Sequence, residues 1–438
     1  MEWLHPFVPW IGGLLSLGCL LAAFRNFRRK RLTEALPTSR ALGVFIGLVE
    51  MKGAAECENP LHSHIAEAAC VHYEWSIEEH WERTEYVTST DSDGKSTQKA
   101  QTRSGWTSVG NGGASVDFYL KDATGAILVH PEGAEMDPPV VFSRTCTPDD
   151  PVYYGKGPPG DIPDSTRRRR FVEKAIRLHG PVYVVGKARE RKDAAAAEIA
   201  GDGQAPLYLI SGRTEKEVQA SFLLRGLLWS AGGALLLAAG LVIGDMLQGR
   251  DLVARRPFYF ACTGAYFGAW LAAWVWDVFN DLIGLRNRVR EGRALIDVQL
   301  KRRHDLIPNL VRIVSALRDH ERTVHEQLAA LRAQMTATMP GQPGPDHQAL
   351  KPALIAVQEK YPALKAMAAF QALQKELIQT EERIALARDY YNNIATHFNT
   401  RIAQIPDRFV SMLIAMRRFE LLSVRDFERA AVRVDFAK

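Results

Sequence analysis

The sequence predicts a membrane protein of the α+β class, with three transmembrane helices, a β-rich domain and a C-terminal antiparallel bundle of long helices. Three apolar runs have the length of a bilayer span, alternating segments lie between the first two, and a heptad repeat follows the third. Of the 438 residues, 47% are hydrophobic and 24% are charged. This composition is typical of folded domains with buried cores and excludes disorder throughout the chain.

Each apolar run is long enough to cross a bilayer as one helix. The runs hold 18, 19 and 20 residues without a charged side chain and cover 7–24, 226–244 and 257–276, close to the roughly 20 residues that span the hydrocarbon layer. The residues before the first run carry no Lys or Arg, so this run is interpreted as an anchor and not as a signal peptide.

Small residues in the second and third runs suggest how these spans pack. Gly240 and Gly244 are four residues apart in the second run, and Gly264 and Gly268 have the same spacing in the third. This spacing permits close contact between helices. Together with the short turn between the runs, it favours a hairpin.

Basic residues near the span ends predict the orientation. Five of them follow the first run, namely Arg25, Arg28, Arg29, Lys30 and Arg31. The loop after the second run has three that oppose the bias, namely Arg250, Arg255 and Arg256. Because cytoplasmic flanks are enriched in Lys and Arg, we expect a multi-pass protein of the cell inner membrane, with its N-terminus outside and both soluble modules cytoplasmic. The odd number of cysteines outside the runs also fits a reducing compartment.

The region between the first two runs is predicted to be β-rich. Residues 116–120 and 182–185 alternate as strands do, and turn-forming residues punctuate the region at 91–94, 110–113 and 158–160. Strands joined by tight turns are the simplest structure with this pattern.

Several segments of this region resemble the GIDE domain, also called BAM for "beside a membrane". The resemblance covers roughly 40–215 and lies in Cys70-Val71-His72-Tyr73-Glu74-Trp75 and in 118–125, 129–134 and 180–186. In eukaryotes such a domain lies between two spans of mitochondrial RING-type ubiquitin ligases, where a separate zinc-binding RING carries the ligation chemistry. No RING sequence is found in this chain.

A heptad repeat after the third run predicts long paired helices. Apolar positions repeat every three and four residues over 285–331, and a second seam runs over 370–398 and shifts to Ile402 and Ile405. Prolines and glycines at 340–345 predict a bend between the two helices, followed by a shorter helix at 347–360. Pro362 is expected to start the next helix and Pro406 to end it.

This region resembles the LemA family from about 283 to 420. The resemblance lies in 296–311, 361–365, 373–377 and 382–392, in the order of that family's motifs. LemA proteins are bacterial and archaeal membrane proteins with an antiparallel helical bundle, mostly without an assigned activity. We therefore expect five parts: an N-terminal transmembrane anchor at 1–30, a GIDE-like domain at 40–215, a transmembrane hairpin at 222–284, a LemA-like bundle at 285–420 and a C-terminal tail at 421–438.

Searches for catalytic motifs assign no catalytic or cofactor-binding residue and no cofactor. His320 and His325 are five residues apart, so they lie about 140° apart around a helix and cannot share a metal on one face. Residues 155–157 lack the remaining residues of a phosphate-binding loop. The polar residues Lys301, Asp305 and Asn309 share one helix face. They are interpreted as setting bundle register and flanking a kink at Pro308, with a ligand site as the alternative.

Five side chains within 16 residues are candidate zinc ligands: Cys57, His62, His64, Cys70 and His72. No Cys-x-x-Cys pair accompanies them, so the alternative is that they are ordinary buried or surface residues. The run from Arg167 to Arg170 is interpreted as a solvated face, with contact to anionic lipid as the alternative.

The sequence as a whole favours a membrane scaffold or adaptor without catalytic activity. Its expected partners are the lipid bilayer, other membrane or cytoplasmic proteins and a second copy of the chain. Nucleic acid is not among them, because the basic residues flank apolar runs and do not alternate with aromatic residues. Two alternatives remain: a protein related to GIDE-type ubiquitin ligases, and a ligand-sensing membrane protein.

Overall fold

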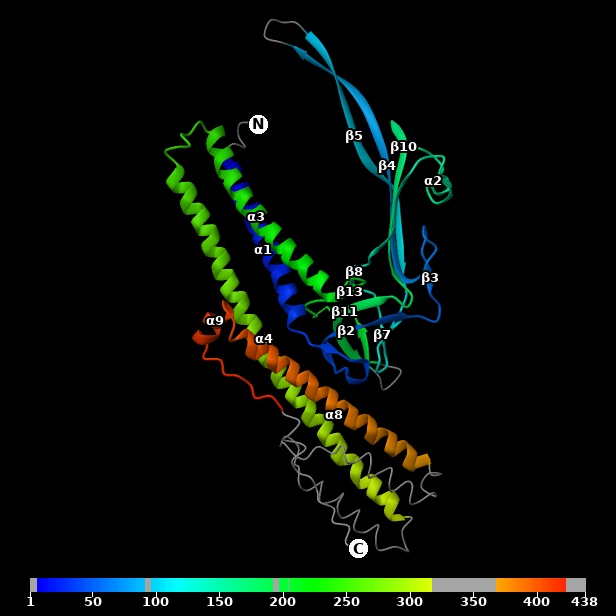
Figure 1. The fold of residues 1–438 in the computed structure, drawn as a ribbon. Coiled ribbons are helices and arrows are strands. Elements are labelled where there is room, and N and C mark those ends of the chain that lie inside the picture. The colour runs from blue at the N-terminus through cyan, green and yellow to red at the C-terminus, as the bar shows by residue number, and fades with distance from the viewer. Residues whose placement is uncertain (1–5, 91–95, 192–196, 204, 317–367, 423–438) are drawn as a thin grey trace. The chain divides into compact units, whose positions relative to one another are not determined.

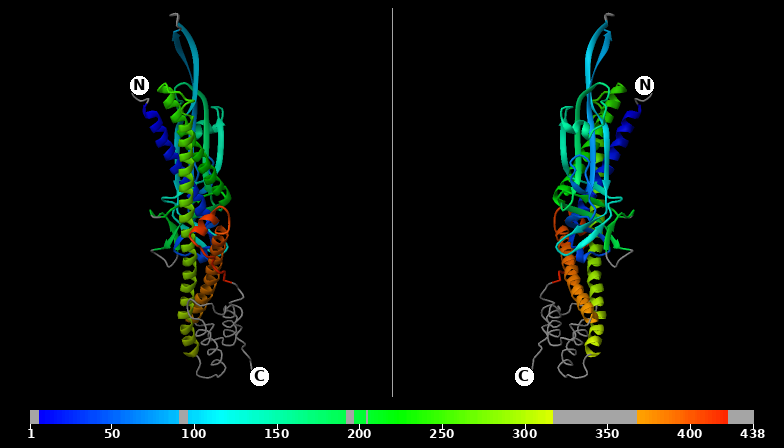
Figure 2. Two further views of the ribbon diagram at one scale, coloured as in Figure 1. Left: turned by 90° about the vertical axis from the view of Figure 1, so that its left-hand side faces the viewer. Right: turned by 90° about the vertical axis from the view of Figure 1, so that its right-hand side faces the viewer.

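The computed structural model describes residues 6–90, 96–191, 197–203, 205–316 and 368–422. It divides into two compact units: the first is Met1–Pro37 with Gln219–Lys438, and the second is Thr38–Val218. Figures 1 and 2 show the first unit as long helices and the second as strands. Each unit is described by itself below. The predicted mixture of helices and strands is confirmed.

The second unit contains a small closed barrel. Its strands pair in the order β2, β6, β7, β12 and β11, and β11 pairs with β2 again to close the ring; they are Gly47–Glu56, Phe118–Lys121, Ala126–Val129, Ala197–Ala200 and Pro181–Glu190. Three short strands extend this sheet, namely β1 (Thr38–Ser39), β13 (Leu209–Ser211) and β8 (Glu135–Asp137). Alternate apolar side chains fill the barrel, among them Met51, Phe118, Leu120, Val184 and Ile199.

A second sheet in this unit is built on a long hairpin. The hairpin strands β4 (Ala69–Thr90) and β5 (Ser96–Ser115) pair along their length, and the other strands are β3 (Leu61–His62), β10 (Ser165–Arg177) and β9 (Val140–Cys146). The short helix α2 (Pro151–Gly155) lies between β9 and β10 in sequence. Ile77, Tyr153 and Phe171 form the core of this sheet, with Trp75 packed against it.

The turn predicted at 110–113 is wrong, because these residues lie inside strand β5. A Cβ built on Gly112 would lie 2.9 Å from the indole of Trp75, and one on Gly110 would lie 3.2 Å from the same ring. The glycines therefore leave room for an aromatic side chain to lie flat across the strand. The turn predicted at 158–160 lies in the loop between α2 and β10, and that at 91–94 lies outside the described residues.

Three helices of the first unit are long and apolar enough to cross a membrane: α1 (Val8–Glu34), α3 (Glu215–Leu247) and α4 (Arg256–Ala316). Their most apolar stretches are largely uncovered by protein, with 28%, 22% and 6% of the residues buried. Leu14, Leu235 and Phe260 are each at least 70% exposed. The three predicted apolar helices are thus present, with apolar faces turned outward.

The contacts of the glycines in the second and third apolar runs differ from the prediction. Gly240 meets α1, where a Cβ would lie 2.9 Å from the Cα of Gly12, and Gly244 lies against the ring of Pro9. In contrast, a Cβ on Gly264 or Gly268 has nothing within 4 Å among the described residues. Helices α3 and α4 contact each other through larger groups, because the Tyr266 hydroxyl donates to the Ser230 carbonyl oxygen at 2.7 Å. The close contact is therefore between α3 and α1.

Helix α4 pairs with α8 (Ala368–Arg401), and α9 (Asp407–Leu413) follows. Arg302 is bonded to Glu376 at 2.8 Å, and Arg401 to Asp281 at 3.0 Å, so residue numbers rise along one helix as they fall along the other. The helices are therefore antiparallel. Their predicted seam is buried where it is described, at Leu285, Val289 and Ile296 on α4 and at Leu377, Ile384, Ala387, Tyr391, Ile394 and Phe398 on α8.

Two details of the predicted seam are wrong. Ile405 is 70% exposed, because α8 ends at Arg401 and the seam ends with Ile402. Pro406 does not end α8 but stands at the start of α9, where a residue without an amide hydrogen is tolerated. Helix α4 continues past Pro308 to Ala316. The described seam also includes Gln299 and Arg303, which are buried. The seam positions after Ala316, the predicted bend at 340–345, the helix at 347–360 and Pro362 lie outside the described residues.

The contact between α1 and α3 gives a testable prediction. Gly240→Leu should lower the melting temperature of the detergent-solubilised full chain by a few degrees, because overpacking a close contact costs about 1–3 kcal/mol. Gly264→Leu is the matched control, since its Cβ meets open space within the described structure. Equal shifts in the two variants would contradict the contact between α1 and α3.

Candidate functional site

The five candidate zinc ligands do not come together in the structure. Cys57 donates to the Asp117 carbonyl oxygen at 3.5 Å, His64 stacks on Trp75 with ring centroids 4.5 Å apart, and His72 bonds the Ser115 hydroxyl at 2.7 Å. Cys70 is fully buried, and His62 lies on β3 opposite Ala69. Within the described residues no three His, Cys, Asp or Glu side chains are arranged to hold a metal ion.

The local environment also opposes metal binding by Cys70. Burial, aided by the nearby Glu173 carboxylate, raises the pKa of the Cys70 thiol to about 11. A zinc ligand must be a thiolate, so Cys70 is poorly suited to that role at neutral pH. Burial lowers the pKa of His72 and favours its neutral ring, and one nitrogen of that ring bonds the Ser115 hydroxyl.

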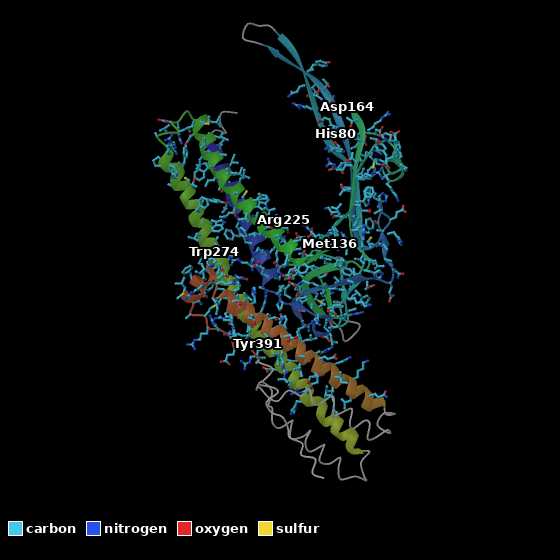
Figure 3. All side chains as sticks on the ribbon, in the orientation of Figure 1. His80, Met136, Asp164, Arg225, Trp274 and Tyr391 are labelled. Atoms are coloured by element: carbon cyan, nitrogen blue, oxygen red, sulfur yellow. The ribbon has the colours of Figure 1, made fainter. Side chains whose placement is uncertain are left out.

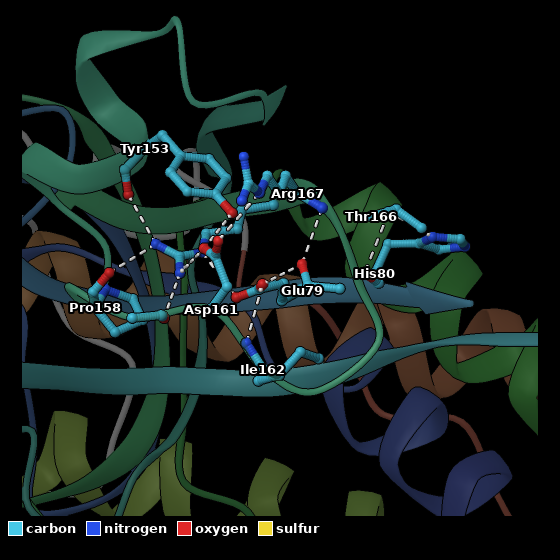
Figure 4. A network of polar contacts seen from close by, with 11 residues as sticks. Glu79, His80, Tyr153, Pro158, Asp161, Ile162, Thr166 and Arg167 are labelled. Atoms are coloured by element: carbon cyan, nitrogen blue, oxygen red, sulfur yellow. Dashed lines mark hydrogen bonds and ion pairs between the residues drawn. The ribbon is translucent and has the colours of Figure 1, made fainter. Parts of the chain in front are cut away.

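A network of polar contacts that includes Glu79, Tyr153, Pro158 and Asp161 holds the loop after α2 (Figure 4). Its centre is a buried arginine. Arg169 is fully buried, and all its donors are used: Nε donates to Glu79, Nη1 to the carbonyl oxygens of Tyr153 and Pro158, and Nη2 to Gly160 and Asp161. The guanidinium also stacks on the Tyr153 ring, with 4.0 Å between its Cζ and the ring centroid. This set of contacts fixes the loop on strands β4 and β10.

The carboxylate opposite Arg169 is satisfied as well. Glu79 is fully buried and accepts from the Ser165 hydroxyl at 2.5 Å and from the Ile162 amide at 3.3 Å. The prediction of a solvated arginine run is therefore wrong for Arg169. Arg170 stacks on Trp106 at 4.2 Å, whereas Arg167 and Arg168 are exposed. The network explains the strand geometry and leaves no donor of Arg169 for a ligand.

Another polar cluster joins three parts of the barrel. His130 lies between two carboxylates, with Nδ1 2.8 Å from Asp117 and Nε2 3.1 Å from Glu198. A hydrogen bond from Arg189 is the main cause that lowers the pKa of Glu198, and the bond from His130 adds to it. Sequence analysis missed this cluster, because its members come from positions far apart in the chain.

The clearest binding geometry lies on α8. Asn399 donates to the Phe419 carbonyl oxygen at 2.8 Å and accepts from the Phe419 amide at 2.9 Å. Asn392 makes the same two bonds to Leu422, both at 2.9 Å. Two amide side chains seven residues apart therefore hold the backbone of an extended segment along the helix. Such contacts recognise backbone and not side chains, and here they hold the chain's own Phe419 and Leu422 on α8.

Further contacts secure the same segment. The Tyr391 hydroxyl donates to the Glu420 carbonyl oxygen at 2.9 Å, and the rings of Phe398 and Phe419 meet edge to face at 5.2 Å. Tyr391 and Asn392 lie in a motif noticed in the sequence, yet nothing there indicated this role. The seven-residue spacing of Asn392 and Asn399, two turns on one face, is the signal that was available.

Comparison with known families agrees with both resemblances. Residues 293–436 match the model of the LemA family, and residues 85–244 match the GIDE model, which is described as E3 Ubiquitin ligase. The chain thus joins a GIDE-type segment to a LemA-type segment. The recognition of both from sequence is confirmed, although the GIDE match begins later than the predicted 40 and extends into α3.

Two curated proteins share a short stretch with the chain. They are Magnetosome protein MamQ 2 and Magnetosome protein MamQ 1 of Paramagnetospirillum magneticum (strain ATCC 700264 / AMB-1), each 30% identical over 67 residues. The aligned stretch is 15% of this chain and about a quarter of the length of these relatives, 25% of each. No solved structure matches the chain.

The Arg169 network predicts a strong effect of one substitution. Arg169→Met should destabilise the strand unit by about 3–5 kcal/mol, because it leaves the Glu79 charge buried without its partner. Hydrogen exchange of β4 and β10 in the full chain measures the loss. Arg168→Met is the matched control at an exposed neighbour, and adding Glu79→Leu to Arg169→Met should restore part of the protection. Equal exchange in the Arg168→Met and Arg169→Met variants would refute this reading of the network.

Proposed function

We propose that this protein is a multi-pass membrane scaffold or adaptor without catalytic activity of its own. In this proposal its N-terminus lies outside the cell inner membrane, and its GIDE-type and LemA-type modules face the cytoplasm. There they present surfaces to membrane or cytoplasmic proteins, or to a second copy of the chain. The two family matches by themselves suggest a membrane-associated adaptor or a ligase-related protein.

Exposure of apolar side chains supports membrane insertion. The outward faces of α1, α3 and α4 carry large residues such as Leu14, Leu235 and Phe260, which would be costly to leave in water. The three helices also pack on each other through glycine and aromatic contacts, as helices in lipid do.

The loop after α3 carries the three arginines that oppose the charge bias. Two of them pair with a buried carboxylate, because Asp245 of α3 lies 3.2 Å from Arg250 Nη1 and 2.7 Å from Arg255 Nε. The orientation follows the count of Lys and Arg, and the five basic residues after α1 outnumber these three arginines. This count favours a cytoplasmic location for the end of α1.

The observation that carries the scaffold proposal is the continuity of α4. This helix has 61 residues, so it is about 90 Å long at 1.5 Å per residue. Its first part is an apolar span, and Leu282, Leu285 and Val289 are already buried in the packing that follows. Helix α4 therefore contains both the membrane span and the segment that packs against α8. It would hold α8 at a fixed position above the bilayer.

Disruption of the seam tests the scaffold proposal. Ile384→Asp places an unpaired carboxylate at a site 1% exposed and should separate α8 from α4. On native gels of mild-detergent extracts, the chain should then move from a larger complex to a smaller species. Ala385→Asp, on the exposed face, should leave the complex unchanged. An unchanged complex in both variants, or a wild-type chain that runs alone, would argue against a scaffold.

An engineered disulfide between α4 and α8 tests whether Ile384→Asp separates the two helices. A Cβ on Gly292 would lie 3.7 Å from the Cβ of Tyr391, within the range of disulfides. Gly292→Cys with Tyr391→Cys should cross-link on oxidation and keep the two halves joined after the chain is cut between them. Adding Ile384→Asp should prevent the cross-link.

Cysteine accessibility tests the orientation. Cys57 and Cys262, the two native cysteines that are not buried, are first replaced by Ser. In this background, cysteines introduced one at a time at Ala254, Glu132 and Ala372, all exposed, sample the loop after α3, the GIDE-type module and α8. A membrane-impermeant maleimide added to intact cells should label only the Ala254→Cys protein, because the other two positions are proposed to be cytoplasmic. All three should react after the membrane is permeabilised. Labelling of Glu132→Cys or Ala372→Cys in intact cells would reverse the proposed topology.

A ligase-related role is the second candidate, and the GIDE match favours it. Sequence analysis found no RING and no other transfer site, so a separate subunit would have to supply that chemistry. Transfer of ubiquitin or a ubiquitin-like protein by the full chain purified together with its bound subunits would support a ligase-related role over a plain adaptor. A ligand-sensing role, the other alternative drawn from the sequence, stays a prediction.

A further inference from the structure

A cavity of about 420 Å³ lies in the helical unit, where α1, α3 and α4 meet the turn between α8 and α9. Its walls combine aromatic and cationic side chains, namely Phe27, Trp270, Trp274, Lys30, Arg31 and Arg401. Trp274 is labelled on α4 in Figure 3. Apolar rings beside positive charge suit a ligand that has both an apolar part and an anionic group.

The cations that line the cavity are not equivalent. Lys30 is paired with Glu34 at 2.5 Å, and Arg401 with Asp281 at 3.0 Å and with Asp407 at 2.5 Å. Arg31 has no ion-pair partner within 4 Å among the described residues, and its Nη1 is buried without a hydrogen-bond acceptor. The Trp274 ring lies 5.8 Å from its Cζ. Arg31 is therefore the group with donors left for an anion.

Acidic groups near Arg31 do not neutralise it fully. Asp277 interacts electrostatically with Arg31, but also with Arg28, so one carboxylate is shared between two guanidinium groups. Asp281 is held by Arg401 on the other side. A buried donor without a partner is unfavourable, and an anionic ligand that accepts from it would remove this cost.

Exposed apolar residues surround the cavity. Leu223 and Leu227 of α3 are 40% and 52% exposed, and Ile405, which also lines the cavity, is 70% exposed. On α9, Phe409, Met412 and Leu413 are 61–84% exposed. Tryptophan, arginine and exposed apolar side chains at the end of a span are typical of the interface between acyl chains and headgroups. The apolar surface of the spans thus continues to the edge of the cavity.

We propose that this cavity binds an anionic phospholipid, with the phosphate at Arg31 and the acyl chains along α3 beside Leu223 and Leu227. This inference rests on the proposed membrane insertion of α1, α3 and α4, but not on which side of the membrane the modules occupy. Helix α9 lies in the headgroup layer of the same leaflet. The lipid fills the space between the spans and the end of α8, so it strengthens the joint between the membrane anchor and the LemA-type helices.

Lipid retention by the full chain tests the proposal. The protein is purified in mild detergent, incubated with phosphatidylglycerol or phosphatidylcholine, and bound lipid is counted by native mass spectrometry alongside the melting temperature. One phosphatidylglycerol should be retained per chain and raise the melting temperature, whereas phosphatidylcholine and inorganic phosphate should do so far less. Equal binding of both lipids, or equal stabilisation by inorganic phosphate, would overturn the assignment of an anionic lipid.

Variants locate the site. Arg31→Gln should weaken phosphatidylglycerol binding about tenfold or more, the scale of a charge-assisted hydrogen bond, and Arg31→Lys should recover part of it. Arg25→Gln is the matched control, because Arg25 is exposed on the same helix and does not line the cavity. If the lipid-free Arg31→Gln variant has the same melting temperature as the lipid-free wild type, the variant folds. Equal binding by the Arg25→Gln and Arg31→Gln variants would place the lipid elsewhere.

The experiment separates failure of this inference from failure of the proposed function. Alkaline carbonate releases peripheral proteins from membranes but leaves inserted helices in place. If carbonate extracts the chain, membrane insertion is wrong and the lipid proposal falls with it. If the chain stays in the membrane but Arg31→Gln binds lipid as the wild type does, only the lipid proposal is wrong.

Discussion

The helical unit depends on one constraint, which is that α4 remains a single helix from its apolar part to its seam. Leu282 and Leu285 are already buried within three turns of Trp276, which is 71% exposed in the apolar run. The apolar run at the start of α4 therefore determines which face of the same helix carries the seam. An interruption between these positions would free α8 to rotate, because α8 is held mainly by its packing on α4. The position of α8, whose Asn392 and Asn399 hold the 419–422 segment, follows from this continuity.

The strand unit is stabilised in a different way. The barrel buries an ordinary apolar core, whereas the long hairpin sheet also buries charged side chains that are hydrogen-bonded. Glu173, for example, is buried and accepts from the amides of Ile65 and Ala66 and from the Ser63 hydroxyl. Such buried polar contacts add little net stability compared with apolar packing, but they allow few alternative loop conformations. The loops around β10 are thus defined by hydrogen bonding.

Buried acids of the barrel and of the junction between α4 and α8 are stabilised differently. In the barrel, burial raises the pKa of Glu50, and the nearby Glu215 carboxylate adds to this effect. Hydrogen bonds from Thr38 and Tyr183, at 2.8 and 2.9 Å, oppose the shift. At the end of α8, in contrast, Arg401 is paired directly with Asp281 of α4. Tight ion pairing there suits a helix junction that must keep one geometry beside a cavity.

The sequence by itself determined the types of element, because periodicity and apolar length are local properties of the chain. The three apolar helices, the buried seam residues such as Ile384 and the strands at 182–185 are all present as predicted. Only the tertiary structure decided which partners meet. Gly240 packs on Gly12 and not on α4, the glycines at 110–113 make room for Trp75, and Arg169 is buried by a loop that precedes it. These contacts join segments far apart in sequence, so they depend on packing that no local pattern encodes.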